Sequence, residues 1–289
     1  MCLIAFAIDA DAACPLLIAS NRDEFLDRPT APLHRWALPG GEQVVAGRDL
    51  RDGGTWLGVS ASGRVAMLTN VRDAQPGPGR RSRGELPTRW LQGDLEWPAM
   101  VETLDPADYG GFNLVIGDVR TRLWAWVGNR DPEYPHQAAR PQLHTRRLAP
   151  GVYGLSNASL DTPWPKTVQL RQAVQDALLP AARRDDARTW LKPLSRALGS
   201  GEPVAEQDMP STGAPRELER SLSSAFVRMP ERGYGTRSSL VLRATAPVDG
   251  LAGGAASEAS WSVDVHEWTH TPAVTDWSLG AARSETLRW

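Results

Sequence analysis

Residues 1–25 read MCLIAFAIDADAACPLLIASNRDEF, and this stretch decides how the chain begins to fold. Two apolar runs, residues 3–8 and 15–21, flank a short polar segment with the composition of a turn. This pattern predicts a β-hairpin. Antiparallel pairing would return the charged block at residues 20–25 to the first residues of the chain. We therefore expect the Cys2 thiol to lie beside charged side chains.

Cys2 stands directly behind the initiator methionine. Removal of Met1 would leave a thiol and a free α-amine on the same residue. A thiolate is a strong nucleophile, and an α-amine with a pKa of about 8 is a usable base at neutral pH. One residue can therefore supply both groups that acyl transfer needs. In the predicted hairpin it would face Arg22, Asp23 and Glu24.

The rest of the chain places a helical pair between strand-rich regions. Strand patterns occur at residues 55–60, 64–70, 112–117, 122–127, 152–157, 234–242 and 260–266, and helical patterns at 165–178, 185–198 and part of 84–104, where Pro98 interrupts. Residues 199–215 and 246–257 have the composition of loops. This order differs from the regular alternation of a doubly wound sheet. We predict one α+β domain over residues 1–289, with two mostly antiparallel sheets and helices outside them.

Composition and charge limit the classes of function that the chain can have. The chain has 289 residues, of which 41% are hydrophobic, enough for a substantial core. Its formal net charge of −2 argues against nucleic acid or an acidic membrane as the partner. There is no secretory signal pattern and no apolar run long enough to cross a bilayer. We expect a cytoplasmic protein.

Cysteine, lysine and tryptophan usage add three observations. Two cysteines, Cys2 and Cys14, are too few for a disulfide framework and favour a reduced intracellular protein. They would approach each other across the first hairpin, which leaves an oxidised form as an alternative. The basic residues are almost all arginine, and only Lys166 and Lys192 depart from this. Twelve tryptophans would supply core residues and apolar walls for a pocket.

Residues 266–270, HEWTH, match the H-E-x-x-H signature of zinc proteases. That motif binds zinc only on a helix, where residues i and i+4 share one face. Here the preceding residues 260–265 alternate polar with apolar, which is the period of a strand. Histidines four residues apart on a strand are separated by about 13 Å, too far for one metal ion. We expect no metal site, and Cys2 remains the best candidate nucleophile.

Residues far apart in the chain complete a known pattern around Cys2. The matching positions are Asn21 and Asp23 of an N-x-D element, Asn70 and Asn157 at the ends of apolar strands, and Arg237 in Tyr-Gly-Thr-Arg-Ser-Ser. With an N-terminal cysteine, they resemble the N-terminal nucleophile hydrolases of the cholylglycine hydrolase and penicillin V acylase type. Those enzymes carry an arginine directly before the N-x-D element, where this chain has Ser20. Arg22, on the same strand face, is the candidate to replace it.

A closer resemblance covers nearly the whole chain. The motifs are MCLI at residues 1–4, SNRDEF at 20–25, RP at 28–29, GRD at 47–49, GGTWLG at 53–58 and LTN at 68–70. On these motifs the chain is identified as a member of the NRDE family, also called the Tango-type transport and Golgi organisation family. The resemblance implies a four-layer αββα fold of the N-terminal nucleophile type. Roles suggested for the family include haem mobilisation and lipid or acyl-group metabolism.

The resemblance implies hydrolysis of a small non-peptide amide or acyl conjugate through a thioester on Cys2, with no cofactor required. The implied roles are oxyanion donors for Asn70 and Asn157, orientation of the α-ammonium for Asp23, stabilisation of the thiolate for Arg22 and Arg237, and substrate binding for Arg22, Asn21 and Glu24. Binding without chemistry is the alternative. Cys2 would then ligate haem iron, with arginines on the propionates and tryptophans as apolar walls. Cys14-Pro15 is a Cys-Pro dipeptide of the haem-regulatory type, but the start of a strand with a proline is the better interpretation of it.

Overall fold

The computed structural model describes residues 2–72, 77, 79–137, 140–183, 186–246, 261–272 and 277–288. Within this part of the chain the strands form two antiparallel sheets of seven strands each. Sheet A has the order β10-β1-β2-β12-β13-β14, and the short β11 pairs with β12. Its strands are β1 (Cys2–Ile8), β2 (Leu16–Phe25), β10 (Gly151–Leu155), β11 (Arg228–Met229), β12 (Tyr234–Thr245), β13 (Ser262–Pro272) and β14 (Trp277–Arg288).

Sheet B is a meander in which each strand pairs with the next along the chain. Its strands are β3 (Thr30–Ala37), β4 (Gln43–Asp49), β5 (Leu57–Ser60), β6 (Arg64–Asn70), β7 (Phe112–Asp118), β8 (Leu123–Gly128) and β9 (His144–Arg147). The helices are α1 (Glu85–Leu91), α2 (Trp97–Glu102), α3 (Pro165–Ala182), α4 (Ala187–Leu198) and α5 (Arg216–Ser221), with 3₁₀ turns η1 (Pro106–Asp108), η2 (Glu206–Asp208) and η3 (Pro230–Arg232).

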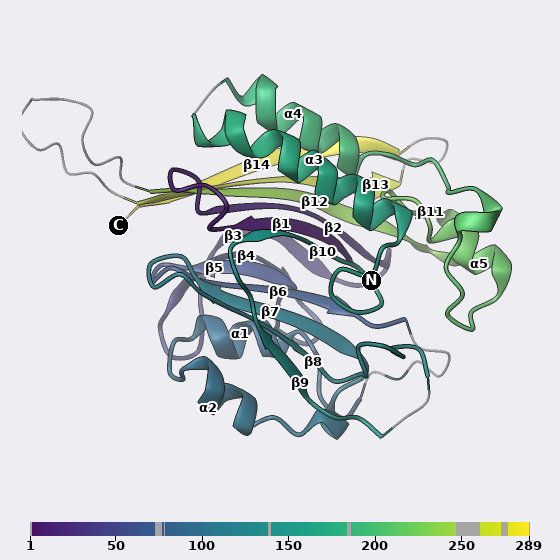
Figure 1. Ribbon diagram of the computed structural model, residues 1–289, viewed down its shortest axis with the longest axis horizontal. Helices are drawn as coiled ribbons and strands as arrows, with labels where there is room; N and C mark the ends of the chain where they lie inside the picture. Colours follow the sequence, from purple (N-terminus) through teal and green to yellow (C-terminus); the bar gives the residue numbers. More distant parts are fainter. Residues whose placement is uncertain are drawn as a thin grey trace, which may run out of the picture.

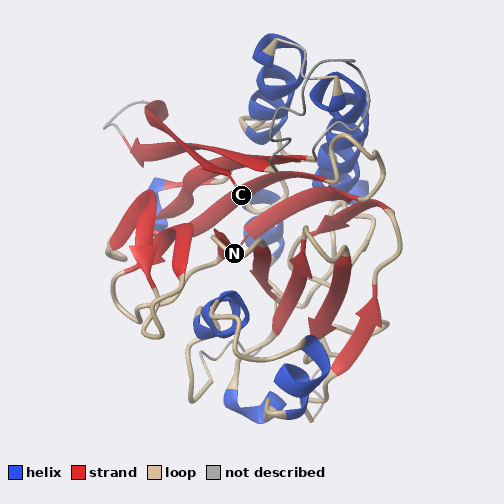
Figure 2. Ribbon diagram, turned by 90° about the vertical axis from the view of Figure 1, so that its left-hand side faces the viewer, coloured by secondary structure: helices blue, strands red, loops and turns tan. Residues whose placement is uncertain are grey.

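The two sheets stack face to face, and helices cover their outer faces (Figures 1 and 2). One apolar cluster, which includes Phe6 and Met67, lies between the sheets. A second joins the outer face of sheet A to α3 and α4, and a third joins the outer face of sheet B to α1 and α2. The layers therefore run helix, sheet, sheet, helix. This confirms the α+β, αββα architecture that the sequence predicted.

The first hairpin forms as the sequence predicted. β1 pairs antiparallel with β2, which places Cys2 opposite Arg22 and Ile8 opposite Leu16. Because side chains alternate along a strand, even-numbered residues such as Ile4 face sheet B. Odd-numbered residues such as Leu3 face the helices instead. β1 is buried on both faces, which explains its continuous apolar run.

The other predicted strands and helices occur at the expected places, and β13 and α3 extend beyond their predicted ends. Pro98 does not interrupt a helix; it lies in the first turn of α2, where its missing N–H makes no difference. The predicted connection at residues 246–257 lies outside the described residues from position 247 on. The sequence patterns did not indicate β3, β4, β9, β14 or α5. β3 shows why, because only Leu33 and Trp36 of its side chains are buried.

Cys2 and Cys14 do not approach each other, contrary to the sequence-based alternative. Cys2 lies where β1 begins, whereas Cys14 lies in the turn that joins β1 to β2, at the opposite end of the hairpin. A strand of seven residues separates them by roughly 20 Å. Both thiols are free and buried.

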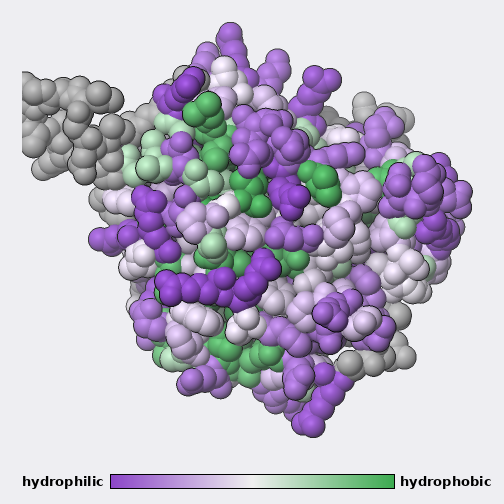
Figure 3. All heavy atoms as spheres, in the orientation of Figure 1, coloured by the Kyte–Doolittle hydropathy of each residue, from purple (hydrophilic) through white to green (hydrophobic). Residues whose placement is uncertain are grey.

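Polar residues dominate the face of the molecule shown in Figure 3, and hydrophobic side chains appear there in small separate groups. Among the described residues, no helix is both long and apolar enough to cross a membrane. Groups of this size on one face need no special explanation, because folded proteins expose scattered apolar side chains.

Candidate active site

Cys2 lies at the first position of β1, on the face of sheet A that looks toward sheet B. Its side chain is only 7% exposed, but it lines a cavity of about 800 Å³. Pockets of this volume hold small molecules in many proteins. The cavity is bounded by the ends of β2, β4 and β6 and by segments near residues 82–84 and 214–234. The thiol is therefore within reach of a ligand that enters this cavity.

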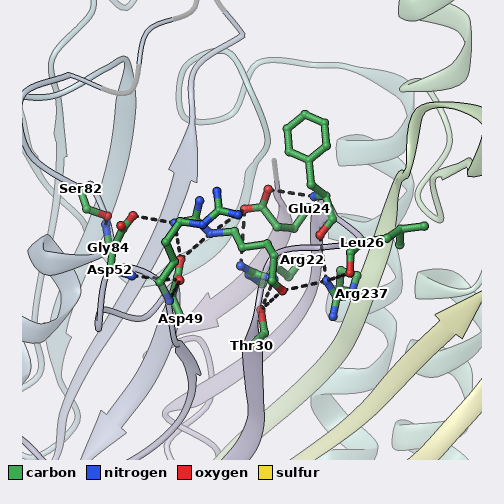
Figure 4. A network of polar contacts seen from close by, with 12 residues as sticks. Arg22, Glu24, Leu26, Thr30, Asp49, Asp52, Ser82, Gly84 and Arg237 are labelled. Atoms are coloured by element: carbon green, nitrogen blue, oxygen red, sulfur yellow. Dashed lines mark hydrogen bonds and ion pairs between the residues drawn. The ribbon is translucent and has the colours of Figure 1, made fainter.

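Charged side chains of β2 surround the thiol. Arg22, directly opposite Cys2 in the ladder, is 5% exposed and stacks its guanidinium 4.2 Å from the centre of the Trp56 ring. It also pairs with Glu24 at 3.5 Å and donates to Thr30 Oγ1 at 3.4 Å. Figure 4 shows Arg22 between Glu24 and Thr30. Arg22 thus lies beside Cys2, as the sequence predicted. Its contact with the Trp56 ring fixes the plane of the guanidinium.

A second arginine fixes the loop at the cavity mouth. Arg28 pairs with Asp49 on β4 and with Asp52 at 2.6 Å, and its Nε lies 3.8 Å from Glu24. Glu24 therefore lies between two guanidinium groups. This network, drawn in Figure 4, ties β2 to β4 on the rim. In the described residues, both oxygens of Glu24 are engaged by protein groups, because Oε1 accepts from the backbone N–H of Phe25.

Burial raises the pKa of the Cys2 thiol, because the thiolate loses hydration inside the protein. Arg22 acts in the opposite direction, but its effect is smaller. Arg22 therefore favours the thiolate, as the sequence predicted, but burial outweighs its effect on the pKa. The resting state holds a neutral thiol, and a base must remove its proton when a bond forms.

Asp23 lies next to Cys2 but on the other face of the strand. It is 1% exposed, and it accepts a hydrogen bond from Thr236 Oγ1 at 2.7 Å. Burial raises the pKa of this carboxyl, while the Lys166 ammonium lowers it in part. Asp23 also lines the cavity. The structure therefore brings Cys2 and Asp23 together as predicted.

Lys166 is a functional candidate that the sequence reasoning did not assign. It lies in the first turn of α3, is 3% exposed, and donates from Nζ to the carbonyl of Leu222 at 2.8 Å. Burial lowers its pKa to about 8, and the charges of Asp23 and Cys2 act on it. A signal was present in the sequence, because Lys166 is one of only two lysines in an arginine-rich chain.

The two asparagines of the predicted oxyanion site take different positions. Asn70 ends β6 and lines the cavity, and within the described part of the chain its side-chain amide makes no hydrogen bond. Asn157 is fully buried, donates from Nδ2 to the carbonyl of Asn70 at 2.9 Å, and accepts from Ser156 Oγ. It connects the end of β10 in sheet A with the end of β6 in sheet B. Asn70 therefore faces the cavity, and Asn157 supports it from behind.

Asn21 does not reach the cavity, contrary to its predicted role in substrate binding. It is 0% exposed and faces the helices. Both of its amide hydrogens are taken, by the carbonyls of Leu198 and Ala225 at 2.8 Å each, and its oxygen accepts from Ser239 Oγ at 2.6 Å. The period of the strand explains the difference, because Asn21 is odd-numbered and Cys2 is even-numbered.

Arg237 is also directed away from the thiol. It stands at an irregularity in the pairing of β12 with β2, between Thr236 and Ser238. Such a bulge turns one side chain out of the regular alternation. Its Nη1 donates to the carbonyls of Phe25, Leu26 and Arg28 at 2.8, 3.1 and 3.2 Å, as Figure 4 shows for Leu26. Arg237 therefore holds the turn after β2 and is not among the residues that line the cavity.

The HEWTH segment lies in strand β13, as its alternation predicted. Each polar member has a separate partner: His266 contacts Ser284 Oγ, Glu267 accepts from the backbone N–H of Leu33, and His270 contacts Ser239 Oγ. Within the described residues, no group of three or more histidine, cysteine, aspartate or glutamate side chains is placed to hold a metal ion.

Comparison with known proteins identifies the family of this chain. The sequence profile described as Transport and Golgi organisation 2 matches residues 1–247. The chain belongs to the Transport and Golgi organisation 2 family. This confirms the resemblance drawn from the NRDE motifs.

Relatives in this family come from distant organisms. The Bos taurus Transport and Golgi organization protein 2 homolog is 33% identical over 258 residues, which cover 84% of this chain and 88% of that protein. The Homo sapiens homolog is 35% identical over 190 residues, or 62% of this chain and 64% of that protein. The Drosophila melanogaster Transport and Golgi organization protein 2 is 27% identical over 264 residues, covering 84% and 87%.

A comparison with solved structures finds two proteins that are similar to this chain. One is a mutant of the conjugated bile acid hydrolase from Clostridium perfringens, with a TM-score of 0.46 and 9% identity over 87% of this chain and 91% of that one. The other is a Caenorhabditis elegans ortholog of N-acylethanolamine-hydrolyzing acid amidase, with a TM-score of 0.44 and 10% identity over 78% of this chain and 98% of that one.

Proposed function

We propose that this member of the Transport and Golgi organisation 2 family is an amidohydrolase-like protein that cleaves a small non-peptide amide or acyl conjugate through a thioester on Cys2. One observation carries the proposal. The Cys2 thiol is the strongest nucleophile among the residues lining the cavity, whose volume of about 800 Å³ suits a small substrate.

In the proposed reaction, the Cys2 sulfur bonds to the carbonyl carbon while its proton passes to the α-amine freed by removal of Met1. The oxyanion accepts a hydrogen bond from the side-chain amide of Asn70, which faces the cavity without another partner in the described chain. The ammonium returns the proton to the leaving amine, and water then cleaves the thioester. Asp23, next to Cys2, holds the ammonium in place.

The raised pKa of Cys2 makes proton removal a requirement of this mechanism. A neutral thiol reacts slowly, so bond formation depends on a base close to the sulfur. We therefore expect acylation of Cys2 to speed up as the pH rises through neutrality. A Cys2 that reacted equally fast at pH 6 and pH 8 would contradict the raised pKa.

Intact mass spectrometry with peptide mapping tests the proposal. The native protein is incubated with an acyl p-nitroanilide series and with an activated acyl ester. The expected result is loss of Met1, acylation at Cys2 ahead of Cys14, and release of p-nitroaniline with regeneration of the thiol. Cys2→Ala abolishes turnover, and Cys14→Ala is the matched control that keeps it. Asn70→Ala lowers turnover by about 10²–10³-fold, the usual loss for one oxyanion donor.

Retention of Met1, or acylation of Cys2 no faster than that of Cys14, would rule out the proposed hydrolysis. A second candidate would then stand, in which the same cavity binds haem or an acyl ligand without chemistry. The lining of the cavity favours this candidate, because Trp56, Leu68 and Leu222 give it apolar walls. A haem titration tests it directly. A Soret band unchanged by Cys2→Ala and by Cys14→Ala would exclude ligation by either thiol.

A further inference from the structure

The cavity beside Cys2 holds more positive than negative side chains. The charged residues that line it are Arg22, Arg28, Arg51, Arg72, Arg83 and Arg232 on one side and Asp23, Glu24, Asp49 and Asp52 on the other. Arg22 and Arg28 are paired with these carboxylates. Arg51 and Arg232 lie exposed at the rim. Arg72 and Arg83 are left as the inner cations, and their contacts decide what the cavity can bind.

Arg72 is a buried cation with unused donors. It is 7% exposed, and its Nη1 pairs with Glu219 of α5. Its Nε and Nη2 atoms are buried and have no hydrogen-bond partner among the described residues. The face of the guanidinium stacks on Trp164, 4.9 Å from the ring centre. Buried N–H groups without a partner cost about 1–3 kcal/mol each, but these two atoms are closed off from solvent, so Arg72 offers no donor that a ligand in the cavity can reach.

Arg83 is a half-buried cation without a carboxylate partner in the described chain. Its Nη1 donates to the carbonyl of Gly111 at 3.1 Å, and the guanidinium makes no other hydrogen bond or ion pair within the described residues. Arg83 and Cys2 line the same cavity, and the negative charge of Glu24 acts on the Arg83 guanidinium. Burial lowers the pKa of Arg83, because its charge loses hydration, and an anion beside it would compensate for that loss.

The backbone holds Arg83 in place. The carbonyl of Gly84 accepts from the N–H of Thr55 at 3.0 Å, which ties this loop to the segment before β5. A Cβ on Gly54 would lie only 2.3 Å from the Gly84 oxygen, so the close approach of the two loops needs glycine there. A cation fixed in advance loses little freedom when it binds an anion.

We propose that the substrate carries an oxyanionic group, a carboxylate or a phosphate, which Arg83 holds while its carbonyl lies at Cys2. Planar guanidinium groups bind both oxyanions through paired hydrogen bonds. The proposal rests on the proposed hydrolysis for the reaction, but the preference for anions belongs to the cavity itself. The cavity thereby selects acyl compounds with a negative group near the scissile bond.

A pair of alkylating reagents of nearly equal size tests this preference. Iodoacetate is anionic and iodoacetamide is neutral, and in both the cysteine sulfur displaces iodide. The rates at Cys2 are measured on the native protein by mass spectrometry, with glutathione as the reference thiol. The expected ratio of the iodoacetate rate to the iodoacetamide rate is about tenfold or more above that of glutathione, which corresponds to about 1.4 kcal/mol.

Two variants of the same loop locate the effect. Arg83→Met removes the charge while keeping a similar volume, and it should return the ratio toward that of glutathione. Arg81→Met is the matched control, because Arg81 pairs with Glu85 at 2.8 Å and does not line the cavity. It should leave the ratio unchanged. Protection of Cys2 by acetate or by inorganic phosphate then shows which of the two oxyanions the site prefers.

A ratio at Cys2 equal to that of glutathione, or a Cys2 that neither reagent modifies, would overturn the proposal. A ratio that Arg83→Met leaves high would also overturn it, because the preference would then come from Arg22. Alkylation needs no amide cleavage and no release of Met1. An anion preference without turnover would therefore reject the hydrolase alone, whereas turnover of neutral amides without a preference would reject the oxyanion site alone.

Discussion

Single residues on opposite faces of one strand have different tasks. Asn21 is part of a buried hydrogen-bond chain, in which the Ser239 hydroxyl donates to its oxygen. That hydroxyl has one hydrogen, so His270 must donate from Nε2 to the Ser239 oxygen at 2.9 Å. The chain ties β2, β12 and β13 to the carbonyls of Leu198 and Ala225. It stabilises the helix side of sheet A and takes no part in the chemistry on the other side.

We predict that His270 makes stability depend on pH. Burial lowers its pKa to about 4, below the value of about 6.5 in an unfolded chain. The unfolded state then binds more protons between these values, so the stabilisation is present above pH 6.5 and is lost as the pH falls toward 4. Between pH 7 and pH 5 the free energy of unfolding should fall by about 2 kcal/mol more in the wild type than in His270→Gln.

Urea unfolding at the two pH values measures this difference. His270→Gln is the suitable variant because its amide keeps a donor for Ser239 without titrating. Phe25 on β2, whose side chain is 55% exposed and carries no titratable group, supplies the control variant Phe25→Ala, for which the pH dependence should follow the wild type. Equal losses in the wild type and in His270→Gln would show that His270 is not the titrating group.

At the scale of elements, the short helix α5 closes one side of the cavity. Its Glu219 is 1% exposed, pairs with Arg72 after β6, and accepts from the backbone N–H of Thr212 at 2.9 Å. Leu218 and Leu222 of the same segment line the cavity. A helix of six residues has little stability of its own, so these contacts hold it in place.

We predict that Glu219→Gln loosens α5. The substitution leaves the buried Arg72 guanidinium without its counter-charge, a loss that typically costs 3–5 kcal/mol. Local opening should then expose the bonds after Arg216 and Arg220, with trypsin cleavage about tenfold faster or more. Glu217→Gln, on the exposed side of the same helix, is the control and should cleave at the wild-type rate. Equal cleavage of the two variants would mean that other contacts hold α5.

At the scale of the whole molecule, the apolar cluster between the sheets joins both halves of the sandwich. Phe6 of β1 is 0% exposed and stacks on Tyr153 of β10, with ring centres 5.4 Å apart. The same cluster includes Val65 and Met67 of sheet B. Since both sheets share this core, neither buries its inner face without the other.

We predict that Phe6→Ala lowers the free energy of unfolding by about 3–5 kcal/mol, the usual loss for a buried phenylalanine. The transition should remain single and cooperative because the core is continuous across both sheets. Phe25→Ala, at a side chain that is 55% exposed, should change stability by less than about 1 kcal/mol. Urea unfolding followed by tryptophan fluorescence and by circular dichroism measures both variants. Two separate transitions would show that the sheets unfold independently.

Local patterns predicted the first hairpin, the strands at residues 55–60, 64–70, 112–117 and 122–127, the helical pair and the strand that contains HEWTH. They also predicted which residues share a face, so Cys2 and Arg22 were expected side by side. These features follow from the period of a strand and from apolar runs, both of which depend on near neighbours. Strands such as β3 and β9 were not predicted, because few of their side chains are buried and their sequences therefore lack an apolar pattern. Their positions are set by the neighbouring strands of the sheet.

The sequence by itself determined the family, the sheet-rich layers and the position of Cys2 beside a charged strand end. Only the tertiary structure decided which residues reach the thiol. It brings Asn70, Arg72 and Arg83 to the cavity and turns Arg237 away at a bulge. It also buries Cys2 enough to raise its pKa. The physical reason is that a cavity forms where strand ends and loops from distant parts of the sequence meet. A local sequence pattern predicts neither which distant strands pair nor how deeply a side chain is buried.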